Sequence, residues 1–189
     1  MKKILIAGVI GFGLVLSGCG KSEAEKAKET VEMNEIDIES KTGEWQVVVN
    51  RDEMRNTESK WLALRSSNNA DLNFPYDGEN RLQLDILDSK SGSARIFLTI
   101  DKGQYDCGSY GCSVSIKFGN NPVQDVRFHE YDTQGSDGTI LVLDGGSSKP
   151  FLQNIRTFKT IIVEVPFYSN GLKQFKFNTK KFNEAEKQI

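Results

Sequence analysis

The sequence has a single histidine, His129, and only three cysteines among its 189 residues. It contains neither a Gly-x-Ser-x-Gly elbow nor a His-Glu-x-x-His motif, so two familiar hydrolase signatures are missing. The alternation around His129 directs its side chain to solvent, where a base would still need a nucleophile and an orienting acid. A zinc site would need more ligands than these. We therefore expect no catalytic residues, no metal and no cofactor.

The sequence also has no long apolar run. The longest covers 15 positions, 4–18, whereas a helix that spans a membrane needs about 20. Lys2 and Lys3 precede this run, and small residues close it. A basic start, a short apolar core and a small-residue end are typical of a secretory signal. The alternative is a transmembrane anchor that is never cut, but four glycines within the run weaken it as a permanent helix.

The run ends in Leu16-Ser17-Gly18-Cys19, which resembles the lipobox of bacterial lipoproteins. This resemblance implies that residues 1–18 are a signal peptide, removed by cleavage before Cys19. It also implies that Cys19 then carries acyl chains such as palmitate, which anchor the protein in a membrane. The following residue is Gly20 rather than Asp, which implies export to the outer membrane, facing the periplasm, where the cell has one.

Cleavage would leave 22 basic and 26 acidic residues, a net charge of −4. This balance, with no Arg/Lys-rich run interleaved with aromatics, argues against nucleic acid as a partner. Residues 19–43 carry charges of both signs and few large apolar side chains, which predicts a flexible polar tether. The alternative is a helix that pairs with a partner. Residues 44–189 form the predicted globular domain.

From residue 44 onward apolar residues recur at every second position, as in half-buried antiparallel strands. The pattern predicts a mainly β fold, an antiparallel β-sandwich of about nine strands. A short connecting helix is expected to begin at 147–150, capped by a serine, and a C-terminal helix is expected over 179–187. The predicted strands are 45–50, 61–66, 81–87, 95–101, 113–118, 123–130, 139–143, 160–168 and 174–178.

Cys107 and Cys112 lie between two of these strands. In an exported protein an even pair favours a disulfide, which would staple the mouth of a loop. A redox pair, part of a metal site and free thiols are the alternatives. Tyr105 and Tyr110 flank the pair and would be displayed on a rigid tip as contacts for a partner. The alternative for both tyrosines is ordinary packing over the disulfide.

Further along, lysines gather near the C-terminus, where we expect them to be solvated and to protect an edge strand. The alternative is contact with anionic lipid headgroups. Five aspartates lie near predicted strand ends, where loops can converge to hydrolyse a substrate or bind Ca²⁺, although ordinary turns also need such residues. These aspartates are Asp77, Asp101, Asp132, Asp137 and Asp144.

Beyond the lipobox, the chain loosely resembles small uncharacterised lipoproteins of bacteria and their prophages. The resemblance rests on Trp45, on the Leu-x-x-Arg-Ser-Ser-x-Asn segment 62–69 and on Asp-x-Gly-Gln-Tyr-x-Cys at 101–107. We expect a membrane-anchored, non-catalytic module that binds an envelope protein or a cell-wall component. The alternatives are a carboxylate-based hydrolase of cell-wall or glycan material and a lipoprotein that excludes superinfecting phage.

Overall fold

The computed structural model describes residues 42–131, 133 and 137–189. These residues belong to one compact unit. The predicted signal peptide, the predicted lipidation site Cys19, nearly all of the predicted tether and Asp132 lie outside the described residues. The elements are β1 (Gln46–Asp52), β2 (Thr57–Arg65), β3 (Leu82–Leu87), β4 (Arg95–Ile100), β5 (Cys112–Phe118), β6 (Gln124–Glu130), β7 (Ile140–Leu143), the 3₁₀ turn η1 (Gly145–Ser147), α2 (Ser148–Thr157), β8 (Thr160–Phe167), β9 (Gly171–Asn178) and α3 (Phe182–Glu186).

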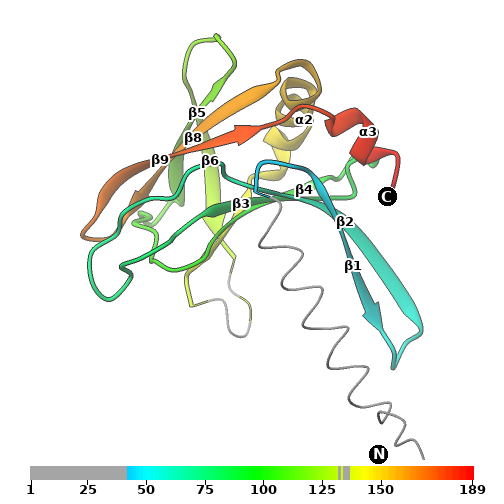
Figure 1. The fold of residues 1–189 in the computed structure, drawn as a ribbon, viewed down its shortest axis with the longest axis horizontal. Coiled ribbons are helices and arrows are strands. Elements are labelled where there is room, and N and C mark those ends of the chain that lie inside the picture. The colour runs from blue at the N-terminus through cyan, green and yellow to red at the C-terminus, as the bar shows by residue number, and fades with distance from the viewer. Residues whose placement is uncertain (1–41, 132, 134–136) are drawn as a thin grey trace, which may run out of the picture. The chain divides into compact units, whose positions relative to one another are not determined.

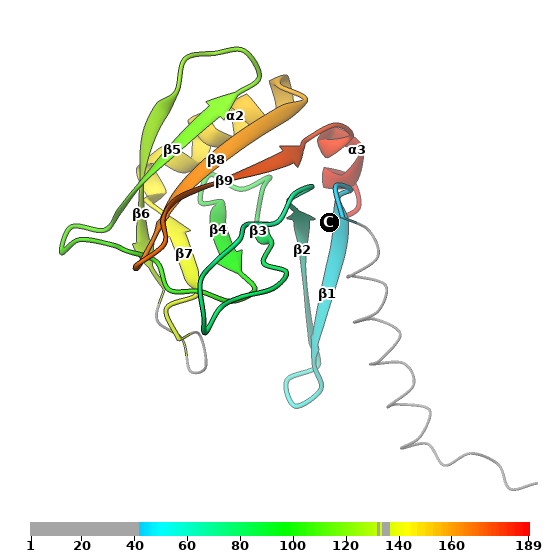
Figure 2. The ribbon, with the colours of Figure 1, turned by 60° about the vertical axis from the view of Figure 1, so that its left-hand side comes forward.

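The nine strands and the two short α-helices confirm the mainly β, antiparallel class. The strands form one antiparallel sheet in the order β1-β2-β3-β4-β7-β6-β5-β8-β9. Neighbours in the sequence pair with each other, except where β4 meets β7 and β5 meets β8. The sheet folds over itself, so that β5, β8 and β9 cross above β2, β3 and β4 (Figures 1 and 2). The two layers of the sandwich are therefore halves of one continuous sheet.

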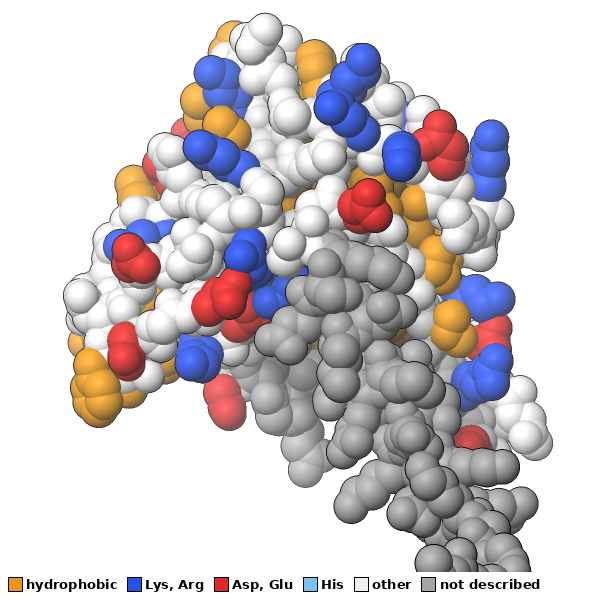
Figure 3. Space-filling model, viewed as in Figure 1, with side chains coloured by type: hydrophobic (Ala, Val, Ile, Leu, Met, Phe, Trp, Pro, Cys, Tyr) orange, Lys and Arg blue, Asp and Glu red, His pale blue; other side chains and the backbone are white. Residues whose placement is uncertain are grey.

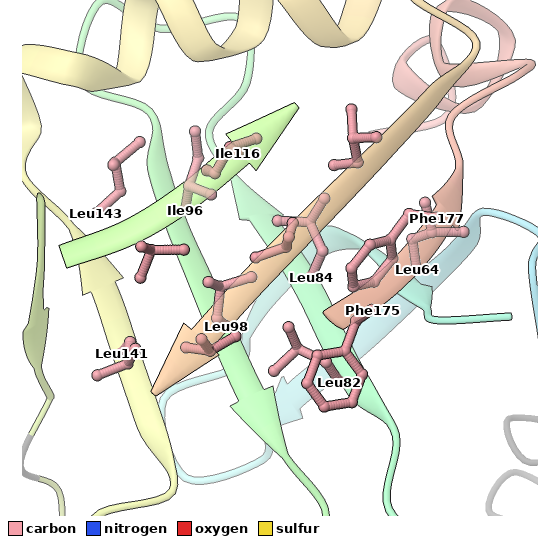
Figure 4. Packing of buried hydrophobic residues seen from close by; sticks show 14 of the residues in the cluster. Leu64, Leu82, Leu84, Ile96, Leu98, Ile116, Leu141, Leu143, Phe175 and Phe177 are labelled. Atoms are coloured by element: carbon pink, nitrogen blue, oxygen red, sulfur yellow. The ribbon is translucent and has the colours of Figure 1, made fainter. Parts of the chain in front are cut away.

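The hydrophobic core fills the space between the two layers (Figure 4). Strand β5 shows why, because Val114, Ile116 and Phe118 alternate with serine and lysine and are all buried. Leu84 of β3 and Phe175 of β9 point into the same space from the opposite layers (Figure 4). Each such side chain contributes about 1.5–3 kcal/mol on burial. The alternation of apolar and polar residues therefore places one face of a strand in the core between the two layers.

The connecting helix α2 packs on the core through Phe151, whose ring lies 5.5 Å from that of Phe118. Pro150 stands in the first turn of the helix, where a missing N–H is harmless. The expected serine cap was wrong, since the Ser147 side chain makes no capping hydrogen bond. Instead η1 runs straight into α2, and the Ser148 N–H bonds to the Gly145 carbonyl oxygen. No helix in the described part of the chain is long and apolar enough to cross a membrane.

Strand β9 is an edge of the sheet, and the segment after β2 covers part of that edge. The backbone N–H of Ser67 donates to the carbonyl oxygen of Lys176 at 2.8 Å. The Asn68 side chain accepts from the Lys176 N–H at 2.7 Å and donates to the Gln174 carbonyl oxygen at 2.9 Å. These bonds satisfy backbone groups that an open edge would leave available for pairing with another chain.

Strands β8 and β9 separate two distinct ends of the domain (Figures 1 and 2). At one end they are joined by the turn 168–170, and at the other β9 leads into α3. Eight residues in each strand place these ends about 26 Å apart, at 3.3 Å per residue. The two ends expose different kinds of side chain.

Candidate functional site

Three loops meet at the end of the domain opposite α3: the β2–β3 loop 66–81, the β4–β5 loop 101–111 and the β8–β9 turn 168–170 (Figures 1 and 2). We call this surface the loop end. The Tyr168 N–H donates to the Gln104 carbonyl oxygen at 2.9 Å, and the Asp106 N–H donates to that of Pro166 at 3.1 Å. The Asn73 N–H bonds to the side-chain oxygen of Asn170 at 2.7 Å. Hydrogen bonds therefore tie the three loops to one another.

The loop end carries four of the seven exposed large hydrophobic side chains in the described part of the chain. Phe74 in the β2–β3 loop is 89% exposed, and Tyr110 beside the cysteine pair is 83% exposed. Tyr168 and Leu172, on either side of the β8–β9 turn, are 62% and 63% exposed. Apolar side chains are visible at the lower left of Figure 3, over the β2–β3 loop. Exposed aromatics on one surface are typical of a contact area for a partner.

The cysteine pair fixes the loop that carries Tyr110. Cys107 and Cys112 lie at disulfide distance, with Cα atoms 4.5 Å apart. Gly111 adopts φ +95°, and a side chain there would collide with the Phe128 carbonyl oxygen, so only glycine fits. The Arg127 guanidinium also donates to the Tyr110 carbonyl oxygen at 3.4 Å. A closed loop of this size contributes about 2 kcal/mol in the chain-entropy model, and it holds Tyr110 in place.

Tyr105 does not share this exposure, and its predicted role as a partner contact was wrong. It is only 2% exposed, and its ring stacks on Phe167 of β8 at 5.1 Å. Its hydroxyl donates to the Leu98 carbonyl oxygen at 3.3 Å. The loop folds back on β8 and buries Tyr105 against Phe167, whereas the Tyr110 side chain is exposed to solvent.

The loop end is rich in exposed carboxylates. Asp71, Asp77, Asp106 and Asp137 are exposed on its loops or on the neighbouring β6–β7 loop, together with Lys102. The Gly138 backbone in that loop approaches the Gln104 side chain. Arg127, whose guanidinium bonds to the Tyr110 carbonyl oxygen, is also exposed, so the charges around the exposed aromatics are of both signs.

Among the four described candidate aspartates, Asp144 lies apart from the other three. Asp101 accepts from the Arg65 guanidinium at 2.7 Å and from the Arg81 N–H at 2.9 Å, so it holds two strand ends together. Asp77 and Asp137 lie in loops at the loop end, whereas Asp144 follows β7 and leads into η1. Because β7 is antiparallel to β4, Asp144 and Asp101 lie at opposite ends of these two strands.

His129 lies on the outward side of β6 and is exposed, as its strand pattern predicted. Its ring approaches the backbone of Gly111, next to the cysteine pair. Within residues 42–131, 133 and 137–189, no three His, Cys, Asp or Glu side chains are grouped so that they could hold a metal ion.

Asp85 is a buried carboxylate that the strand pattern placed on the solvent side. It stands between Ala63 and Phe97 on the neighbouring strands and is only 8% exposed. The Trp61 indole N–H donates to it at 3.1 Å, and the Gln83 amide donates to both of its oxygens at 3.0 and 3.1 Å. Burial outweighs these bonds and raises the pKa of Asp85 to about 6. The period-two alternation within β3 does not predict this burial, because the residues on either side of Asp85 belong to the neighbouring strands.

Comparison with known protein families, with curated proteins and with solved structures gives no match for this chain.

Proposed function

We propose that this chain is an envelope lipoprotein, anchored through acyl chains on Cys19, whose domain binds a partner without performing chemistry. The partner is an envelope protein or a cell-wall component, and the loop end is the surface that engages it. The anchor is supported by the short basic-apolar leader and by the Leu-Ser-Gly-Cys sequence that ends it. Gly20 supports delivery to an outer membrane, facing the periplasm.

One observation carries the binding role: exposed aromatics stand on loops that are tied together by hydrogen bonds and by the cysteine pair. Aromatic side chains supply much of the energy in protein interfaces when they enter pockets on the partner. Loops that are already ordered lose little conformational freedom on binding, so more of the contact energy appears as affinity. The arrangement therefore supports recognition by Phe74, Tyr110 and Tyr168.

Site-specific photocrosslinking in living cells tests this role. A benzoylphenylalanine in place of Tyr110 or Tyr168 is expected to give a discrete crosslinked species, because both positions face the proposed partner. The matched control is Met54, which is 91% exposed at the tip of the β1–β2 hairpin, away from the loop end (Figure 1). No such species is expected there. Phe74→Ala is expected to lower the yield at Tyr110 about five- to thirtyfold, the effect of losing an anchor worth about 1–2 kcal/mol.

Two results would count against the loop end as the binding surface. One is the same crosslinked species from Met54 as from Tyr110. The other is no crosslink from either tyrosine position in cells where the protein is present at its normal level.

A further inference from the structure

The chain enters the domain beside α3, at the end opposite the loop end. The Trp45 ring lies 5.0 Å from the Phe182 ring of α3, with the planes tilted by 59°. Gly43, Glu44 and Trp45 line a cavity of about 210 Å³ together with residues of α3 and its flanks. Trp45 thus fixes where the preceding segment, with Cys19 at its start, joins the folded domain.

Four exposed lysines belong to the segments at this end of the domain: Lys159 precedes β8, Lys180 and Lys181 precede α3, and Lys187 follows α3. The Thr179 N–H bonds to the Lys159 carbonyl oxygen at 2.9 Å, which holds the start of β8 against the segment that leads into α3. Lys180 and Lys181 line the same cavity as Trp45. Blue side chains gather at the upper right of Figure 3, around the end of β9 and α3. We call this surface the lysine end.

The carboxylates of the lysine end leave it an excess of positive charge. Glu186 is paired with Arg156 at 2.7 Å. Burial alone would raise the pKa of Glu186, but the hydrogen bonds from Arg156 and Ser89 outweigh it and lower the pKa. Glu44 and Glu184 line the cavity together with Lys180 and Lys181, and the exposed Lys159 and Lys187 add two further positive charges at this end of the domain.

We infer that the lysine end lies against a membrane that contains anionic phospholipid, which orients the loop end away from the bilayer. The inference rests on the proposed lipid anchor, because the segment that carries Cys19 joins the domain at this end. Lysine ammonium groups on flexible stems, spread over a surface rather than around a closed pocket, suit a layer of phosphate headgroups.

Fluorescence quenching of Trp45 in the lipidated full protein tests this orientation. The protein carries Trp61→Phe, so that Trp45 is the sole tryptophan, and its fold is checked by circular dichroism. It is reconstituted in vesicles of phosphatidylcholine alone or with phosphatidylglycerol, both with a nitroxide on a small fraction of headgroups. We expect quenching with phosphatidylglycerol that falls by more than about half as ionic strength rises from 0.05 to 0.5 M, because salt screens exposed charges.

Two double charge reversals distinguish an effect of the lysine end from an effect of the net charge of the protein. Lys180→Glu with Lys181→Glu is expected to reduce the quenching to the level of phosphatidylcholine vesicles. Lys102→Glu with Lys173→Glu, which makes the same change of charge near the loop end, is expected to leave it unchanged. Equal quenching in both vesicle types, equal loss in both double variants, or no quenching at all would overturn the orientation, the last favouring an acidic protein on this surface. Failure of the protein to incorporate into vesicles would instead overturn the anchor itself.

Discussion

Replacing Tyr105 with alanine is expected to lower the free energy of unfolding by about 3–5 kcal/mol, the range for removing a large aromatic side chain from a core. Tyr105 is 2% exposed, stacks on Phe167 and bonds to the Leu98 carbonyl oxygen. Its removal leaves a cavity under the loop, and the Leu98 carbonyl oxygen loses its hydrogen-bond donor. Chemical denaturation followed by tryptophan fluorescence measures the effect.

Two matched variants separate the parts of this effect. Tyr105→Phe keeps the ring and removes only the hydroxyl, so a loss of about 1 kcal/mol is expected. Tyr110→Ala, five residues along the same loop, removes an 83% exposed side chain and is expected to change stability by less than about 0.5 kcal/mol. A large loss from Tyr110→Ala, or none from Tyr105→Ala, would contradict the assignment of one tyrosine to the core and the other to the surface.

Replacing Asp85 with asparagine is expected to change stability in a pH-dependent way. The pKa of Asp85 is about 6 in the folded protein against an ordinary value of 3.8, so the folded state binds the proton more tightly. The carboxyl thus stabilises the fold below pH 4, and this contribution is lost as the pH rises through 6. A shift of this size corresponds to about 3 kcal/mol. Asp85→Asn should therefore gain about 3 kcal/mol relative to the natural chain between pH 4 and pH 7.

Denaturant unfolding of both chains at several pH values from 4 to 7 measures this difference. Only the difference between the two chains is informative, because other carboxyls titrate in both. Glu58, for example, has a lowered pKa because of hydrogen bonds from Lys60 and Arg51. A carbon NMR titration of the Asp85 carboxyl provides a second reading, with a midpoint near pH 6 expected. A difference in stability that stays constant across this range would show that Asp85 titrates as an ordinary aspartate.

Local alternation predicts the strands well because one face of most strands is buried and the other is solvated. Strand β4 illustrates this, since Ile96, Leu98 and Ile100 are all buried and the strand ends within one residue of its predicted limit. The helix that follows Gly145 was equally visible, because Pro150 and the spacing of Phe151 and Ile155 indicate a helical start and one apolar face.

The pairing of distant strands and the environment of single residues carry no comparable local signal. Nothing between residues 95 and 143 indicates that β4 pairs with β7 and leaves β5 to pair with β8. Tyr105 is buried because its loop folds back on β8, sixty residues away in the chain. The loop end has the same origin, since Phe74 and Tyr168 meet on one surface only after the sheet folds over itself. The cysteines beside Tyr110 made it a candidate contact residue, whereas no local pattern in the sequence singles out Phe74 or Tyr168.

Labelling growing cells with radioactive palmitate tests most directly whether this domain works from a membrane anchor. We expect that the natural chain incorporates label, that the label resides in the membrane fraction, and that Cys19→Ala abolishes it. The serine variant of both other cysteines, Cys107→Ser with Cys112→Ser, should still be labelled. An unlabelled natural chain, or equal label on Cys19→Ala, would contradict the anchor and the arrangement of the domain that depends on it.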